Sequence, residues 1–87
     1  MTWTIRYTEN AAKQLKKMDR HSTKQILDYM DEIAKLENPF TRGHGLVKNR
    51  KGTWRYRVSD MRILCEIRDL ELIIHVVSVG HRRDVYR

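Results

Sequence analysis

Residues 52–58 read GTWRYRV, and their side chains alternate almost strictly between two kinds. One face of this stretch is apolar and largely aromatic: Trp54, Tyr56 and Val58. The other face is polar and cationic: Thr53, Arg55, Arg57 and then Ser59. Because successive side chains of a strand point to opposite faces, the stretch predicts a strand with an aromatic side and a cationic side. Guanidinium groups suit phosphate binding, although the arginines of a half-buried strand could also simply face water.

The N-terminal part of the chain predicts a strand followed by two helices. Residues 2–7 alternate with Trp3, Ile5 and Tyr7 toward the core, and Thr8 suits the N-cap of a short amphipathic helix. Ser22, followed three residues later by Gln25, has the form of a capping box that would begin a second helix. The Asn38-Pro39 pair should end that helix.

The C-terminal half predicts three strands joined by short turns, at residues 52–58, 62–67 and 72–79. Short connections favour antiparallel hairpins. We therefore expect an α+β fold with a mostly antiparallel four-stranded sheet and the helical hairpin packed on one face. The order is strand, helix, helix, strand, strand, strand, in a single domain over residues 1–87.

The charge of the chain points to a polyanionic partner. Lys and Arg number 18 against 11 Asp and Glu, a formal net charge of +7. Such a balance favours nucleic acid first and an acidic protein second. A single cysteine, Cys65, fits a reducing compartment, and we see no signal peptide or membrane-spanning run, so we expect a cytoplasmic protein.

The segment from Pro39 to Gly52 is punctuated by glycines and predicts a basic loop that leads into the sheet. Its potentially charged side chains are Arg42, His44, Lys48, Arg50 and Lys51. For any one of these residues, a solvated surface connection is an equally good interpretation.

The sequence lacks the residue patterns that several kinds of catalytic chemistry require. The histidines and acidic residues show neither zinc-like nor two-carboxylate spacing, so we expect no metal and no cofactor. No serine has a nucleophile turn, Cys65 alternates with core residues, and no Gly-rich phosphate loop is present.

After these exclusions, the remaining candidate is a group of positively charged side chains, which antiparallel strand pairing should bring together in one concavity. Its members would be Arg55, Arg57, Arg62, His81, Arg82 and Arg83. Such a site could stabilise the phosphorane-like transition state of RNA cleavage, in which the 2′-hydroxyl is the nucleophile.

Arginine stays protonated at neutral pH, so other side chains must move protons. His81 is the first candidate, and Tyr86 could stack on a base or assist the transfer. Lys48 and Lys51 are further candidates. We interpret His75, inside an apolar run, as a core histidine.

Taken in order, these segments resemble the RelE/ParE superfamily of bacterial type II toxins, and within it the RelE-like mRNA interferases. The resemblance rests on residues 52–58, on Arg62-Ile63-Leu64, and on the tail from Ser78 to Tyr86. It implies a ribosome-dependent, metal-independent endoribonuclease that cuts mRNA in the A site, and a cognate RelB-like antitoxin with an acidic region.

The resemblance also implies residue roles. Arg55 and Arg57 correspond to paired basic residues, Arg62 to the phosphate-stabilising arginine, and Tyr86 to a C-terminal tyrosine at the cleaved nucleotide. Either Arg82 or Arg83 corresponds to the basic residue after the Val-Gly pair. The alternatives are a ParE-like DNA gyrase inhibitor without RNase activity and a basic binding domain that is not an enzyme.

Overall fold

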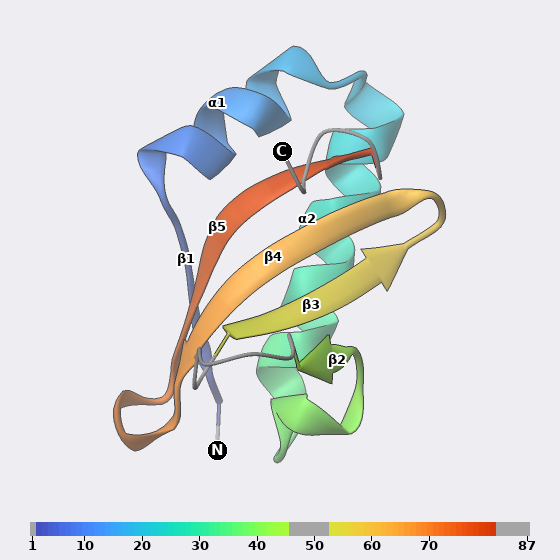
Figure 1. Cartoon of the computed structure of the whole chain (residues 1–87). Helices are drawn as coiled ribbons and strands as arrows, with labels where there is room; N and C mark the ends of the chain where they lie inside the picture. Colours follow the sequence, from blue (N-terminus) through green and yellow to red (C-terminus); the bar gives the residue numbers. More distant parts are fainter. Residues whose placement is uncertain (1, 46–52, 82–87) are drawn as a thin grey trace.

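The computed structural model describes residues 2–45 and 53–81 (Figure 1). Its elements are, in chain order, β1 (Thr4–Tyr7), α1 (Glu9–Lys17), α2 (Arg20–Lys35), the 3-10 turn η1 (Pro39–Thr41), β2 (His44–Gly45), β3 (Thr53–Val58), β4 (Met61–Arg68), the 3-10 turn η2 (Asp69–Glu71) and β5 (Ile73–His81).

The five strands form one sheet in the order β1-β5-β4-β3-β2. β1 pairs with β5 in parallel, and every other pair is antiparallel. The predicted α+β class and helical hairpin are confirmed. The strand count differs from the prediction by one, because the two-residue strand β2 adds to the edge of β3.

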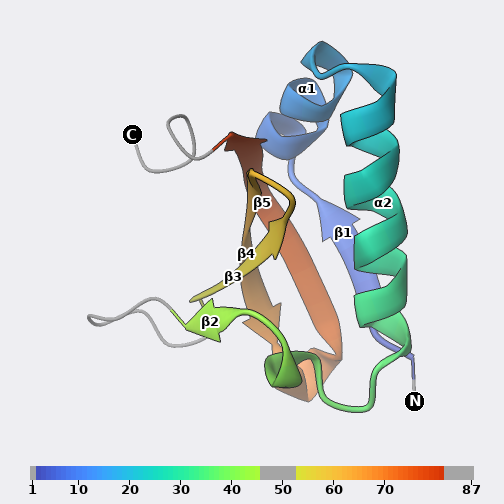
Figure 2. The ribbon, with the colours of Figure 1, turned by 90° about the vertical axis from the view of Figure 1, so that its right-hand side faces the viewer.

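Both helices lie on the same side of the sheet (Figure 2). The hydrophobic core fills the space between the helices and the sheet, and Ile26, Met30 and Ile33 of α2 are fully buried. Tyr56 of β3 is also fully buried, donates a hydrogen bond of 2.7 Å to Pro39 O, and meets Tyr29 edge to face at 5.9 Å. Burial raises the pKa of the Tyr56 hydroxyl above its ordinary value, so the phenol stays neutral and can donate this bond.

The predicted N-cap of α1 is confirmed, whereas the predicted start of α2 is wrong. Thr8 Oγ1 accepts a hydrogen bond of 3.1 Å from Ala11 N. α2 begins three residues before the expected capping box, because the Asp19 carboxylate accepts from Ser22 N at 3.0 Å and Ser22 Oγ at 2.8 Å. These bonds hold the pKa of Asp19 below its ordinary value and place a negative charge at the helix N-terminus.

Beyond the end of β1, the N-cap residue Thr8 and side chains of α1 form hydrogen bonds with the backbone edge of β5. Thr8 Oγ1 and Asn10 Nδ2 each donate a hydrogen bond of 3.1 Å to Val77 O. Two residues further on, Gln14 Oε1 accepts from Val79 N at 2.8 Å and Ser78 Oγ at 3.2 Å. These contacts satisfy backbone groups that an open strand edge would leave unpaired.

No helix among residues 2–45 and 53–81 is both long and apolar enough to cross a membrane.

Replacing Gln14 with Ala should lower the free energy of unfolding by about 1–3 kcal/mol, because the amide of Val79, a residue only 1% exposed, loses its acceptor. Urea unfolding monitored by circular dichroism measures this difference. Lys16→Ala is the matched control, since Lys16 is exposed on the same helix. An equal loss of stability in both variants would contradict the role of the Gln14 hydrogen bond.

Candidate functional site

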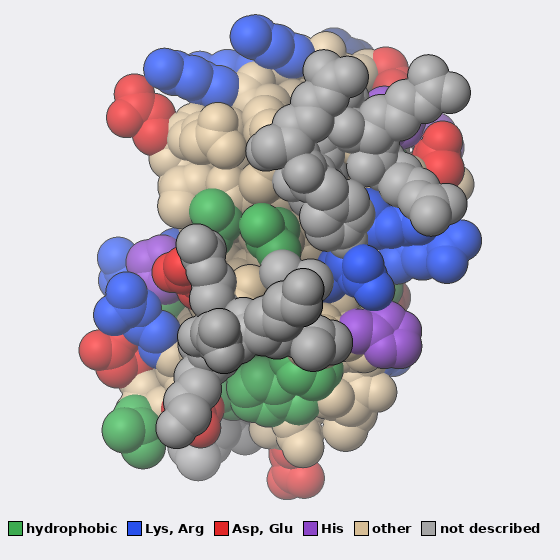
Figure 3. Space-filling view, in the orientation of Figure 1, with side chains coloured by type: hydrophobic (Ala, Val, Ile, Leu, Met, Phe, Trp, Pro, Cys, Tyr) green, Lys and Arg blue, Asp and Glu red, His purple; other side chains and the backbone are tan. Residues whose placement is uncertain are grey.

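The face of the sheet opposite the helices carries the candidate site. The β3–β4 register places Arg57 directly opposite Arg62 and places Arg55 opposite Leu64. The intervening Tyr56 points to the core, so all three arginines share the other face, which we call the open face. Figure 3 views the open face and shows Lys and Arg side chains gathered on its right-hand side, near β2 and β3.

The pair formed by Arg57 and Arg62 is the unusual feature of the open face. Arg57 is exposed, whereas the whole of Arg62 is only 9% exposed. Both guanidinium groups donate long hydrogen bonds to nearby backbone carbonyls, Arg57 Nε to Ser59 O at 3.5 Å and Arg62 Nη1 to Met61 O at 3.4 Å. Within the described ranges 2–45 and 53–81, neither guanidinium has a carboxylate within 4.0 Å. Like charges directly opposite on a sheet destabilise the fold, so this arrangement favours an anionic ligand.

β2 brings a histidine to the same face. His44 lies opposite Arg55 in the β2–β3 register and is exposed. From the sequence we expected His44 only as a member of a basic loop. The signal that could have indicated a strand is the triplet Gly43-His44-Gly45, whose glycines allow the backbone to approach β3 closely.

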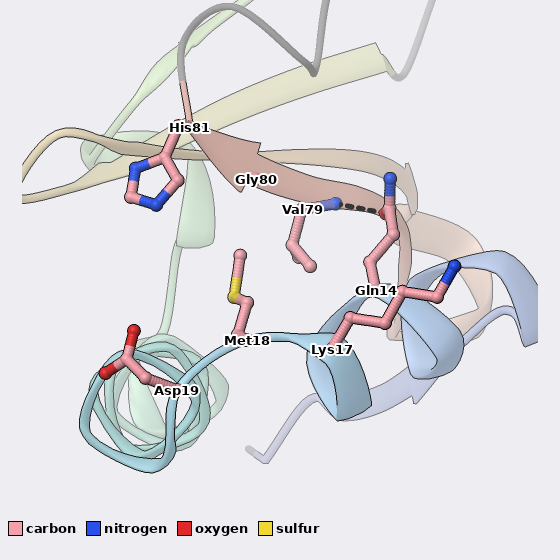
Figure 4. Close-up of a pocket in the computed structure, with 7 residues that line it drawn as sticks. All are labelled: Gln14, Lys17, Met18, Asp19, Val79, Gly80 and His81. Atoms are coloured by element: carbon pink, nitrogen blue, oxygen red, sulfur yellow. Dashed lines mark hydrogen bonds between the residues drawn. The ribbon is translucent and has the colours of Figure 1, made fainter.

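His81 lies on the other side of the sheet. It is opposite the buried Met61 in the β4–β5 register, and its Nδ1 is 3.5 Å from Asp60 Oδ2. Its side chain lines a cavity of about 370 Å³ on the helix side, together with residues of α1, the α1–α2 connection and β5 (Figure 4). The other lining residues are Gln14, Lys17, Met18, Asp19, Val79 and Gly80.

The expected concavity is therefore divided between two faces. Gly80, opposite Arg62, falls on the open face, so strand alternation turns the next residue, His81, toward the helices. The interpretation of His75 also changes: it is half-buried on the open face, in one row with Arg6 of β1 and Glu66 of β4. The remaining predicted site residues lie outside the described residues: Lys48, Lys51, Arg82, Arg83 and Tyr86.

Cys65 is fully buried beneath the sheet, and burial raises the pKa of its thiol above the ordinary value. It therefore stays protonated and unreactive in the folded protein. Among residues 2–45 and 53–81, no three His, Cys, Asp or Glu side chains come together in a group that could hold a metal ion.

Known toxins are similar to this chain in sequence and in structure. A family model described as the ParE toxin of the type II toxin-antitoxin system parDE matches residues 5–86. Toxin RelG of Mycobacterium tuberculosis is 28% identical over 87 residues, which cover 100% of this chain and 99% of RelG.

Solved structures share the fold. A chain of the toxin-antitoxin complex RelBE2 from Mycobacterium tuberculosis superposes with a TM-score of 0.80 at 24% identity, over 97% of this chain and 95% of that one. A chain of the archaeal RelE-RelB complex from Pyrococcus horikoshii OT3 gives 0.75 at 15% identity, over 97% and 99%.

Replacing Arg57 with Gln should stabilise the isolated protein by about 0.2–1 kcal/mol, because it removes one of two like charges that lie directly opposite. Urea unfolding at low salt measures the gain, which should shrink at high salt. Arg68→Gln is the matched control, since Arg68 is opposite the uncharged Ile73. A destabilised Arg57→Gln protein would show instead that Arg57 is held by a favourable contact within the fold.

Proposed function

Because this chain belongs to the ParE toxin family of type II toxin-antitoxin systems, we propose that it is a toxin that cuts mRNA in the ribosomal A site. It would act as a ribosome-dependent, metal-independent endoribonuclease and so inhibit translation. The resemblance to the RelE/ParE superfamily is confirmed, and toxin RelG matches this chain along its whole length.

One observation carries the RNase proposal: Arg57 and Arg62 face each other on an open sheet surface without a carboxylate among the described residues. The fold tolerates this repulsion, and an RNA phosphate would relieve it by accepting hydrogen bonds from both guanidinium groups. Arg62 is largely removed from water, so a phosphate bound there would interact more strongly than one bound at an exposed arginine.

The roles of the arginines follow from the reaction. Attack of a 2′-oxygen on the adjacent phosphorus adds negative charge to the phosphate oxygens in the transition state. Arg55, Arg57 and Arg62 supply positive charge on the face where that phosphate would lie. Arg82, Arg83, Tyr86, Lys48 and Lys51 remain predicted site residues on segments outside the described ones.

A cognate antitoxin is the proposed protein partner. Several of the similar solved structures are complexes of a toxin with an antitoxin, including RelBE2 and the archaeal RelE-RelB complex. The net charge of +7 favours an antitoxin segment with acidic residues. The ribosome and mRNA are the other proposed partners, and the cytoplasm is the proposed location of the activity.

A second candidate function is inhibition of DNA gyrase without RNA cleavage. The description of the matching family model favours it, because that model describes the ParE toxin of parDE. The arginines of the open face favour the RNase. The two candidates differ in their cellular target, so they can be separated in one experiment.

Expression of the chain without an antitoxin should arrest growth and produce new mRNA 5′ ends within codons at the ribosomal A site. Mapping of 5′ ends after induction, with an uninduced culture as control, measures this outcome. Intact transcripts accompanied by gyrase-linked DNA breaks would reject the RNase in favour of gyrase inhibition.

Arg62→Gln should lower the rate of mRNA cleavage by about 10²–10³-fold, because a donor aimed at the developing charge is lost. Cleavage of a defined mRNA on purified ribosomes measures the rate, and circular dichroism checks the fold. Arg68→Gln, at the opposite end of the same strand, is the control and should cleave normally. A folded Arg62→Gln protein that cleaves at the wild-type rate would remove Arg62 from the site.

A further inference from the structure

We propose that His44 is the proton acceptor of the cleavage step and takes the proton of the attacking 2′-hydroxyl. This inference rests on the proposed RNase function, since it assigns a residue to the same reaction. The sequence favoured His81 for this role, but the structure turns His81 toward the helices and pairs it with Asp60.

The strand register places His44 beside the arginines. It lies directly opposite Arg55, and Arg57 is its diagonal neighbour on β3. Directly opposite side chains have Cβ atoms about 4.5–5.5 Å apart, and diagonal ones remain within reach of long side chains. A phosphate bound by Arg57 and Arg62 would therefore lie next to the part of the open face that carries His44. The charged groups that face His44 from the adjacent strand β3 are Arg55 and Arg57. On the segment of His44 itself, Arg42 Nη1 is 3.6 Å from Glu32 Oε2 of α2.

Local packing holds the segment that carries His44. Trp54 Nε1 donates a hydrogen bond of 2.6 Å to Arg42 O, and the Trp54 ring meets Phe40 edge to face at 4.9 Å. Gly43 adopts a φ of 78°, and a Cβ at this position would clash with Arg55 O and the Trp54 ring nitrogen. The backbone on the N-terminal side of His44 is thus fixed against β3, and a fixed position is what a proton acceptor requires.

The other histidines are less suitably placed. His21 is exposed on α2, on the helix side of the sheet. His75 is on the open face but lies in the row of Arg6 and Glu66, five residues before Gly80, the β5 partner of Arg62. Of His21, His44, His75 and His81, only His44 is paired with an arginine of β3, the strand that carries Arg57.

The step balances without another reactant. The 2′-oxygen forms a bond to the adjacent phosphorus, and its proton passes to the unprotonated ring nitrogen of His44. The bond from phosphorus to the 5′-oxygen of the next nucleotide breaks, and that oxygen keeps the electron pair and takes a proton from water. The histidine then returns its proton to solvent, which leaves a 2′,3′-cyclic phosphate and a 5′-hydroxyl.

The test compares purified wild-type protein with His44→Gln on ribosomes programmed with a defined mRNA. At saturating protein, His44→Gln should lower the single-turnover cleavage rate by about 10²–10⁴-fold while its ribosome affinity stays near that of wild type. The wild-type rate should also rise with pH, as expected when an unprotonated side chain accepts a proton, and this rise should be absent from His44→Gln. His21→Gln is the matched control and should behave as wild type.

Trp54→Phe gives a second measurement, because it removes the Nε1 donor to Arg42 O but retains His44. It should lower the rate less than His44→Gln and keep the pH dependence. If wild type cleaves and His44→Gln is unchanged in rate, or loses only ribosome affinity, the inference is overturned and the RNase proposal stands. If wild type leaves the mRNA intact, both are overturned together.

Discussion

The pairing of β3 with β4 is the constraint on which the rest of the molecule depends. Tyr56 opposite Ile63, and Val58 opposite Met61, turn one face of this hairpin toward the helices. The same register sends Arg55, Arg57 and Arg62 to the other face. A slip of one residue would bury guanidinium groups under α2 and expose the Tyr56 ring, so the hydrophobic core itself enforces the position of the charges.

On the open face, the proposed function and the stability of the fold are opposed. Neither Arg57 nor Arg62 forms an ion pair with a carboxylate among the described residues. The fold tolerates their mutual repulsion because buried contacts on the helix side, such as the hydrogen bond from Tyr56 to Pro39 O, stabilise the β3–β4 hairpin independently. Strained or repulsive arrangements of this kind are typical of binding sites. An antitoxin with acidic side chains would relieve the same repulsion as an RNA phosphate.

Local patterns in the sequence predicted most of the fold. Alternation identified the strands around Tyr56 and Ile63, and Thr8 was recognised as an N-cap. Two local predictions failed for different reasons. Asp19 and Ser22 are both good N-caps, and the choice between them depended on which oxygen could accept the free amides of the first turn. β2 is too short to show any alternation, and it forms only because Trp54 and Gly43 hold it against β3.

The candidate site was harder to predict because it depends on which face each side chain takes. The position of Arg57 opposite Arg62 follows from a tight turn between two alternating strands. The side taken by His81 depends on where β5 lies in register with β4, and a bulge between Leu64 and Cys65 shifts that register. Alternation along β5 alone could not reveal this shift.

The parallel pairing of β1 with β5 has a consequence for synthesis of the chain. Tyr7 lies beside Val76, and Thr8 bonds Val77 across 69 positions of sequence. A ribosome releases the N-terminal strand first, yet that strand has no partner until β5 emerges. The sheet therefore closes late, and contacts of such long sequence separation slow folding. A toxin built in this way cannot complete its sheet until β5, the last described strand, has left the ribosome.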